Sequence, residues 1–163
     1  MAERLSFIKL LQAKWDEGKF VCVGLDADVR HKDFPSHLAG SKPVTGHSRF
    51  YAQSSFLRMI IGETADLVCA YKPNAAFFED DPAGEEALED AVNFIHDKYP
   101  DIPVIGDTKR ADIGNTNQGY ARMAFERYGF DAMTLNAQYF GSDTFPPFEE
   151  YSGKGLILMA KTS

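Results

Sequence analysis

Short apolar runs alternate with helix-like segments along this chain of 163 residues, and that alternation restricts the fold more than any other feature. Apolar runs bounded by turn residues predict buried strands, and apolar residues three and four positions apart predict helices. Five strands are expected, at residues 20–25, 67–71, 103–107, 132–135 and 155–160. Strands that alternate with helices pair in parallel through right-handed crossovers. The pattern therefore predicts an α/β fold in a single domain, residues 1–163.

Helices are expected between these strands, at residues 2–16, 48–63, 83–99 and 115–128, with a short helix or turn within residues 141–151. The expected core side of the second helix consists of five apolar residues: Phe50, Phe56, Leu57, Ile60 and Ile61. The polar segment 28–47 follows the first strand and contains Pro35 and Pro43. We expect it to form a long loop, and loops of that length are usually functional or disordered.

Two α/β architectures compete, a doubly wound open sheet and a (β/α)8 barrel. The glycine-rich nucleotide-binding fingerprint expected after a first Rossmann strand is absent from this sequence. Polar residues instead follow several successive strands: Asp26, Lys72, Asp107, Lys109, Asn136 and Ser163. Functional groups spread over many strand ends are typical of the (β/α)8 barrel, which usually needs about 250 residues. We therefore expect only the first five β/α units of such a barrel.

Composition excludes several classes of function. The formal net charge of −7 argues against a nucleic-acid partner, although a pocket could still bind a small anion. No apolar run approaches the roughly 18 residues of a membrane span, and the N-terminus has a polar helical pattern unlike a signal peptide. The cytoplasm is the expected compartment. Cys22 and Cys69 lie in apolar runs and are expected to be buried, reduced thiols. The four histidines are expected to be solvated, and no metal site is expected because none has metal-ligand spacing.

The most informative segment is 104–113, where an apolar run leads directly into two carboxylates and two cations. Positions two apart on a strand point the same way, so Asp107 and Lys109 should share a face. Asp107 and Lys109 could be a surface ion pair, but their position at the end of an apolar strand favours an active site instead. Lys72 ends a second buried run and requires a partner there. Asp112 could be a helix cap, and Asp26 could be a turn residue. Asn136 could be a helix-capping or turn residue as easily as a ligand contact.

Four motifs in order make the chain similar to the orotidine 5'-monophosphate decarboxylases. The segments 20–26, 70–74, 107–113 and 160–163 resemble the ends of the family's first, second, third and fifth strands. The third contains the signature Asp-x-Lys-x-x-Asp-Ile, and Thr116 follows at the family's spacing. The long loop after Asp26 resembles the longer-loop branch of this family.

The resemblance implies a cofactor-free lyase that converts orotidine 5'-monophosphate to UMP in pyrimidine biosynthesis. Its site would contain four catalytic residues, Lys72, Asp107, Lys109 and Asp112, with Lys109 as the proton donor in a network of alternating charges. Five residues would bind the substrate: Asp26, Lys72, Ile113, Thr116 and Ser163. Asp26 and Lys72 would contact the ribose hydroxyls, and Ser163 the pyrimidine. Asp112, Ile113 and Thr116 would reach across a homodimer interface into the neighbouring site.

Three alternatives stay open at this point. The family's barrel continues through further strands whose glutamine and arginine bind the substrate phosphate, so the chain is expected to be a fragment, one part of a two-chain enzyme, or a degenerate relative. Magnesium-dependent sugar-phosphate lyases and synthases, such as hexulose-phosphate synthase, also carry Asp-x-Lys-x-x-Asp, although Lys72 and Ile113 favour the decarboxylase. Finally, a non-catalytic half-barrel would expose open sheet edges and would bind a partner.

Overall fold

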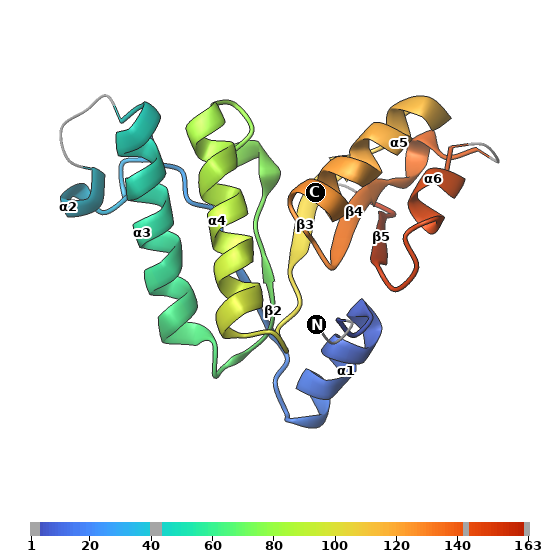
Figure 1. Ribbon diagram of the computed structural model, residues 1–163, viewed down its shortest axis with the longest axis horizontal. Coiled ribbons are helices and arrows are strands. Elements are labelled where there is room, and N and C mark those ends of the chain that lie inside the picture. The colour runs from blue at the N-terminus through green and yellow to red at the C-terminus, as the bar shows by residue number, and fades with distance from the viewer. Residues whose placement is uncertain (1–3, 40–43, 142–143, 162–163) are drawn as a thin grey trace.

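The computed structural model describes residues 4–39, 44–141 and 144–161, and its centre is a row of parallel strands in chain order (Figure 1). The strands are β1 (Val21–Gly24), β2 (Val68–Lys72), β3 (Ile105–Arg110), β4 (Ala132–Asn136) and β5 (Gly155–Met159). β1 pairs with β2, and β4 lies between β3 and β5. Two parallel bridges, Tyr71 with Val104 and Asn74 with Asp107, join β2 to β3. The order is that of consecutive units of a (β/α)8 barrel.

All five predicted strands are present, and the third differs most from its prediction. It was expected to end at Asp107, with the charged cluster at its carboxyl end, but β3 runs from Ile105 to Arg110. Asp107 and Lys109 therefore lie within the strand. The reason is that pairing with β4 resumes at Arg110, opposite Leu135, after an irregular stretch.

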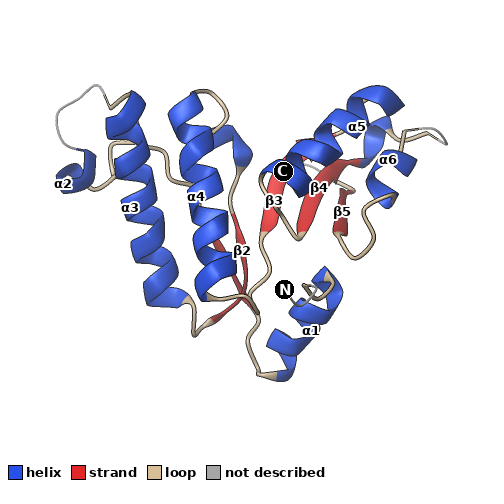
Figure 2. Cartoon of the chain, viewed as in Figure 1, coloured by secondary structure: helices blue, strands red, loops and turns tan. Residues whose placement is uncertain are grey.

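Helices connect the strands and cover one side of them (Figure 2). Their bounds are α1 (Phe7–Asp16), α2 (Ser36–Ala39), α3 (Gly46–Thr64), α4 (Pro82–Lys98), α5 (Gly114–Arg122) and α6 (Pro146–Glu149). A π-helix, η2 (Met123–Arg127), extends α5, and two 3-10 turns, η1 (Ala75–Phe77) and η3 (Ala137–Tyr139), follow β2 and β4. The short helix α2 interrupts the long loop expected over residues 28–47.

Local signals explain where several helices begin and end. The Asp81 side chain accepts a hydrogen bond from the Ala83 N–H at 2.8 Å, and Pro82 occupies the first position of α4. Asp is a favoured N-cap residue. Proline suits the first helical position because it has no N–H, and an N–H there would have no partner within the helix. Gly129 has a φ of +73°, which ends the helical segment that began at Gly114. Glycine adopts that left-handed conformation at little cost.

The main core lies between the strands and the outer helices. Its largest fully buried side chains include Tyr71, Phe78, Phe130 and Phe148, contributed from both halves of the chain. Of the five residues expected on the core side of α3, Leu57 and Ile61 are buried, Phe56 and Ile60 are partly buried against the core, and Phe50 packs instead against Tyr51.

Helix α1 covers the amino-terminal ends of the strands (Figure 1). Phe7 of this helix belongs to a second buried cluster with Cys69, Ala70, Ile105 and Ala132. The Phe7 N–H also donates to the carbonyl of Gly153, just before β5, at 2.8 Å. With one end of the strands closed by α1, the opposite, carboxyl ends remain for a functional site.

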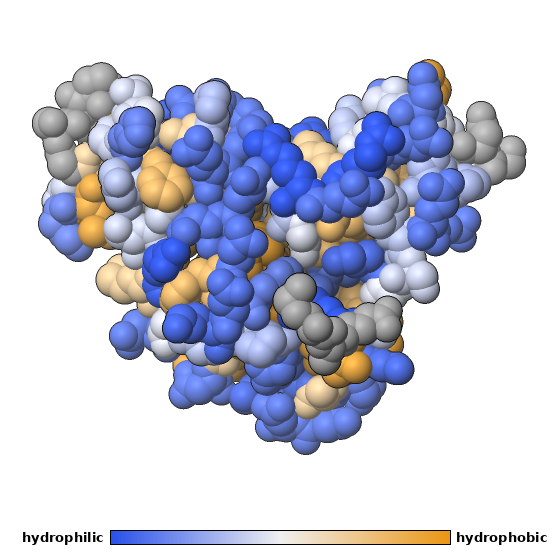
Figure 3. Space-filling view, in the orientation of Figure 1, coloured by the Kyte–Doolittle hydropathy of each residue, from blue (hydrophilic) through white to orange (hydrophobic). Residues whose placement is uncertain are grey.

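The outermost strands of the row carry exposed apolar side chains. Phe20 and Val21 at β1 are 69% and 57% exposed, and Leu158 of β5 is 49% exposed. Cys69 is buried as expected, but the prediction for Cys22 is wrong, because this residue of β1 is exposed. Figure 3 shows that one face of the molecule is mostly hydrophilic and is hollowed between the α3–α4 and α5–α6 groups. Across the described residues, no helix combines the length and apolar composition needed to cross a membrane.

Candidate active site

Three neighbouring strands bring their polar side chains together around the carboxylate of Asp107. The Nζ of Lys109 lies 2.7 Å from its Oδ1, and the Nζ of Lys72, from β2, lies 3.0 Å from its Oδ2. The hydroxyl of Thr134, from β4, donates to Oδ1 at 2.9 Å. Asp107 is only 12% exposed, whereas the Lys109 side chain is 45% exposed. A shielded carboxylate therefore holds an ammonium group that a ligand can reach.

The electrostatics of this cluster favour a charged Asp107. Partial burial raises the pKa of the carboxyl group, but hydrogen bonds from Lys109, Lys72 and Thr134 outweigh burial and lower the pKa below its usual value. Opposite charges and hydrogen bonds both stabilise the ionised form of a carboxyl group. The cluster is therefore a carboxylate held between two ammonium groups at neutral pH.

The backbone at Lys109 is unusual. Its φ is +50°, and no other non-glycine residue in the described ranges has a positive φ. The pairing of β3 with β4 is interrupted between Gly106 and Arg110, so Lys109 lies in the irregular stretch. Side chains with a Cβ disfavour this left-handed conformation, and such residues cluster at functional sites.

Asp26 lies at the same end of the strands as this cluster. Its Oδ1 accepts a hydrogen bond from the N–H of Asn74, two residues beyond Lys72, at 3.2 Å. The Leu25 N–H donates to the Lys72 carbonyl, which continues the pairing of the two strands up to this point. Asp26 is exposed, so a ligand can reach it.

Asp112, Ile113 and Thr116 lie beyond β3, at the start of α5. Asp112 is exposed, and its carboxylate accepts the N–H of Ile113 at 2.7 Å while its carbonyl accepts the Asn117 side chain at 2.7 Å; among the described residues it forms no ion pair. Because Ile113 is the N-cap of α5, Asp112 is not the cap considered in the sequence. Ile113 is 61% exposed and Thr116 is half-buried. Ser163 lies outside the described residues.

An open pocket adjoins these residues, and Lys109 contributes to its lining. Its lining consists of Lys109, Ala111, Asp112, Ile113, Asn136, Tyr139 and Thr144. The Asn136 side chain accepts the Gln138 N–H at 3.2 Å and so caps η3, as one of its two readings predicted. Thus Lys72, Asp107 and Lys109 are in direct contact, Asp26 lies at the same end of the strands, and Asp112 shares a pocket with Lys109.

Two features of the site were missed in the sequence. Thr134 contacts Asp107, but a threonine within an apolar strand run resembles any other strand-forming residue. Arg110, at the end of β3, forms an ion pair with Glu79 and lies over the ring of Tyr120. Arg110 occupies an unspecified position of the signature, and no sequence signal identifies its partner. The pair fixes the end of β3 beside the site.

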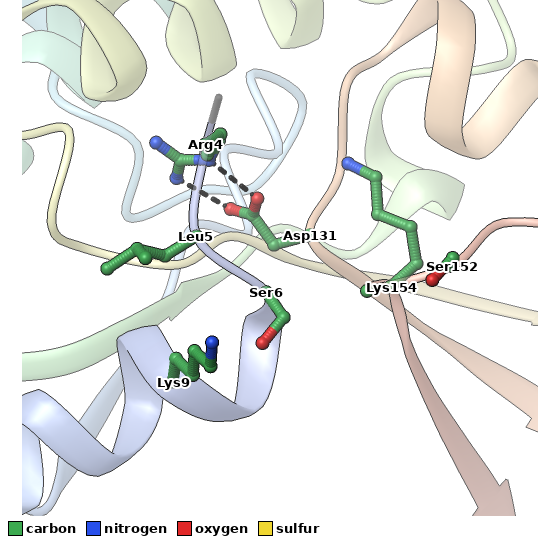
Figure 4. Close-up of a pocket in the computed structure, with 8 residues that line it drawn as sticks. Arg4, Leu5, Ser6, Lys9, Asp131, Ser152 and Lys154 are labelled. Carbon is green, nitrogen blue, oxygen red and sulfur yellow. Dashed lines mark hydrogen bonds and ion pairs between the residues drawn. The ribbon is translucent and has the colours of Figure 1, made fainter. Parts of the chain in front are cut away.

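A second charged cluster lies at the opposite end of the strands, where Arg4 and Asp131 face each other (Figure 4). The Arg4 guanidinium contacts the two Asp131 oxygens at 2.7 and 2.8 Å. Burial raises the pKa of Asp131, but Arg4, His96 and the Val104 N–H hold it well below its usual value. His96, expected to be solvated, is instead half-buried with Nε2 3.4 Å from Asp131. The cluster attaches the N-terminal segment to β4.

Within residues 4–39, 44–141 and 144–161, no group of three or more His, Cys, Asp or Glu side chains is arranged to hold a metal ion.

Comparison with known proteins gives one consistent result. Residues 19–163 match the family model described as Orotidine 5'-phosphate decarboxylase / HUMPS family. The chain is 44% identical to an orotidine 5'-phosphate decarboxylase of Cupriavidus metallidurans over 160 residues, which cover 98% of the chain and 54% of the relative. It is 42% identical to the same enzyme of Ralstonia pickettii, with 98% and 55% covered. The chain thus spans about half the length of the curated relatives it matches.

Solved structures with similar folds agree. A crystal structure of a putative orotidine-monophosphate decarboxylase from Toxoplasma gondii has a TM-score of 0.81 and 38% identity, covering 97% of this chain and 49% of that one. The structure of Leishmania donovani OMP decarboxylase has a TM-score of 0.78 and 34% identity, covering 98% and 55%. These matches confirm the resemblance inferred from the strand-end motifs.

Proposed function

The chain belongs to the Orotidine 5'-phosphate decarboxylase / HUMPS family, with five β/α units of its barrel, and we propose that it carries the charge network of a lyase that decarboxylates orotidine 5'-monophosphate to UMP in pyrimidine biosynthesis. The observation that carries this proposal is the Asp107 carboxylate held between Lys72 and Lys109. A full-length family member would supply the remaining strands and the phosphate-binding groups.

The reaction breaks the bond between the pyrimidine ring and its carboxylate. The bonding electron pair stays on the ring carbon, CO2 departs, and a proton must then reach that carbon. An ammonium group beside the carbon stabilises the developing negative charge and supplies the proton. Lys109 suits this role because its side chain is 45% exposed and its Nζ is oriented by Asp107 at 2.7 Å. No cofactor takes part in the proposed reaction.

Asp107 and Lys72 have separate roles in that step. Asp107 would lie beside the departing carboxylate and repel it in the bound substrate. Lys72 contacts the other oxygen of Asp107 at 3.0 Å and holds it in place. We assign Asp26 and Lys72 to the ribose hydroxyls, which is supported by their position at the same end of the strands. Contact of Ser163 with the pyrimidine stays a prediction.

The remaining members of the site are proposed to act in a homodimer. Asp112, Ile113 and Thr116 would enter the site of the partner copy, completing its alternating charges. The support is their surface position at the start of α5, where Ile113 is 61% exposed and Asp112 forms no ion pair among the described residues. The homodimer and the cytoplasmic location stay predictions.

A second role, as one part of a split barrel, is favoured by the exposed apolar residues at the outer strands. Phe20, Val21 and Leu158 are between 49% and 69% exposed. Unpaired strand edges of this kind normally pair with another chain or are covered. This role is compatible with the same chemistry once the barrel is completed.

The test is release of CO2 from orotidine 5'-monophosphate, first by the purified 163-residue chain and then after addition of the remaining half of a related barrel. Lys109→Ala is the control. Activity in either preparation that Lys109→Ala abolishes and a chelator leaves unchanged would support the decarboxylase. Activity lost with the chelator would contradict the cofactor-free mechanism. No turnover in either preparation would leave the binding role as the better explanation.

A further inference from the structure

The regular backbone pairing between β3 and β4 is interrupted at the candidate site. Regular parallel pairing holds Ile105 opposite Ala132 and Gly106 opposite Met133, and it resumes only with Arg110 opposite Leu135. The stretch between these pairs contains Asp107 and Lys109. On the β4 side, backbone pairing therefore does not fix these two residues, whereas on the β2 side the Asp107 N–H still donates to the Pro73 carbonyl at 2.9 Å.

Two buried threonine hydroxyls bridge this gap. The hydroxyl of Thr108 donates to the carbonyl of Thr134 at 3.0 Å. The hydroxyl of Thr134 accepts the Lys109 N–H at 3.0 Å and donates to the Asp107 Oδ1 at 2.9 Å. Thr108 is 7% exposed and Thr134 is 8% exposed, so water does not readily replace these bonds. Side chains thus make the contacts between the strands that the backbone cannot make here.

We propose that Thr134 is a positioning residue that sets the geometry of the Asp107–Lys109 pair through its single hydroxyl. This inference rests on the proposed function for its catalytic meaning. A hydroxyl has one proton to donate and lone pairs that accept. Because the Lys109 N–H can only donate, the proton of Thr134 is free for Asp107, which is ionised and accepts it. One atom therefore fixes the left-handed backbone of Lys109 and the carboxylate that orients its ammonium group.

Packing alone does not explain a threonine at this position. Valine has nearly the same shape and is also enriched in strands, and it would fill the space without burying a hydroxyl. A buried hydroxyl is favourable only when its hydrogen bonds are made. Both bonds of this hydroxyl go to the Asp107–Lys109 pair. The burial of the hydroxyl is thus tied to the geometry of the site.

The experiment compares Thr134→Val, Thr134→Ser and Thr108→Val in the full chain. NMR would follow the titration of the Asp107 carboxyl carbon and the hydrogen exchange of the Lys109 amide. The charged and hydrogen-bonding groups facing Asp107 are Lys72 from β2, Lys109 from β3 and Thr134 from β4. The lysines are unchanged in every variant, so a shift in the titration reports the hydroxyl.

Thr134→Val should raise the pKa of Asp107 and speed exchange of the Lys109 amide about tenfold, because both hydrogen bonds are lost. Thr134→Ser keeps the hydroxyl and should restore both values. Thr108→Val is the matched control: its hydroxyl is equally buried but does not contact Asp107, so the Asp107 titration should not move. If Thr134→Val does not fold, Thr134→Ala removes the same hydroxyl without adding bulk.

The inference is overturned if Thr134→Val or Thr134→Ala leaves both readouts unchanged. It is also overturned if Thr108→Val shifts the Asp107 titration as far as they do, since that would mean a general loosening of β4. CO2 release is measured separately in the completed barrel, where Thr134→Val should lower kcat more than it raises KM. NMR changes as expected without turnover by the unmodified chain would reject the proposed function but retain the positioning role.

Discussion

The Nζ of Lys109 lies 2.7 Å from the Oδ1 of Asp107, although the backbone between these two residues is not a regular strand. Lys109 has a φ of +50°, in the region that glycine prefers. The ion pair therefore depends on a strained conformation and not on simple strand alternation. Strain of this kind persists only where the surroundings enforce it, and it is characteristic of functional sites.

Glycine is normally less stable than alanine within a strand, but the strain at Lys109 predicts the opposite order for Lys109→Gly and Lys109→Ala. Lys109→Ala keeps the Cβ that disfavours a positive φ, whereas Lys109→Gly removes it. We expect the glycine variant to have the larger free energy of unfolding, by about 1 kcal/mol. Both variants lose the ammonium group, so their difference isolates the backbone. Urea denaturation of the two proteins measures it.

Arg110 provides the control for that comparison. It is the next residue in β3 and has no positive φ. At this position Arg110→Gly should be less stable than Arg110→Ala, by about 0.5–1 kcal/mol, because glycine weakens a strand. The same order at both positions would show that Lys109 is not strained.

The buried pair of Arg4 and Asp131 predicts a large loss of stability when the arginine is removed. Asp131 is 3% exposed, and Arg4→Ala would leave its charge without its main partner. Breaking a buried ion pair from one side typically costs about 3–5 kcal/mol. The matched control is Arg58→Ala. Arg58 pairs with Asp90, which is 22% exposed, so losing this ion pair should lower the free energy of unfolding by less than about 1 kcal/mol. Equal losses in the two variants would contradict the structural importance of the Arg4–Asp131 pair.

The lowered pKa values of Asp107 and Asp131 predict that acid destabilises the chain. A carboxyl group with a folded-state pKa below its unfolded value of about 3.9 stabilises the fold above that pH. This contribution is lost as the pH falls through the folded-state pKa. The free energy of unfolding should therefore change little between about pH 7 and 5 and fall below about pH 4.

Asp131→Asn tests the origin of that loss. The variant has no carboxyl group to protonate at this position, so its stability should fall less steeply below about pH 4. Denaturation at pH 6 and pH 3 would give the slope for each protein. An identical slope in the variant would exclude Asp131 as a source of the acid sensitivity.

Much of the fold could be predicted because its physical causes are local. Apolar runs mark strands buried on both faces, and caps such as Asp81 with Pro82 mark helix starts. The exposure of Cys22 could not be predicted, because burial depends on what packs against a strand and not on the composition of the run. The extension of β3 to Arg110 likewise follows from its pairing with β4, far along the chain.

The site divides in the same way. Asp107, Lys109 and Lys72 could be recognised because charged residues at the ends of apolar runs need partners. The left-handed backbone of Lys109 and the contact from Thr134 could not be recognised, since both arise where residues 25 apart in sequence meet in an irregular stretch between β3 and β4. Asp112 has no ion-pair partner among the described residues, which is consistent with the proposed partners lying in a second copy of the chain.

Gly106 gives a final prediction, because it lies directly before Asp107 and against the ring of Phe130. A Cβ at this position would lie 2.9 Å from the Cγ of Phe130 and closer still to the ring edge. Phe130 is fully buried, so its ring cannot move away without disturbing the core. Gly106→Ala should therefore lower the free energy of unfolding by about 1–3 kcal/mol, and the shift of β3 should weaken the Asp107–Lys72 contact.

Gly62→Ala is the matched control for that substitution. Gly62 lies in α3, where an added Cβ meets nothing within 4 Å, so alanine should stabilise the helix by about 1 kcal/mol. Guanidinium denaturation of the two variants should give changes of opposite sign. The Asp107 carboxyl titration should move toward its unperturbed pKa only in Gly106→Ala, because only there is the strand that carries Asp107 displaced. A stable Gly106→Ala protein with an unchanged Asp107 titration would mean that β3 and Phe130 shift without cost to make room for the added Cβ. The close packing of Gly106 against Phe130 would then not contribute to holding Asp107 between the two lysines.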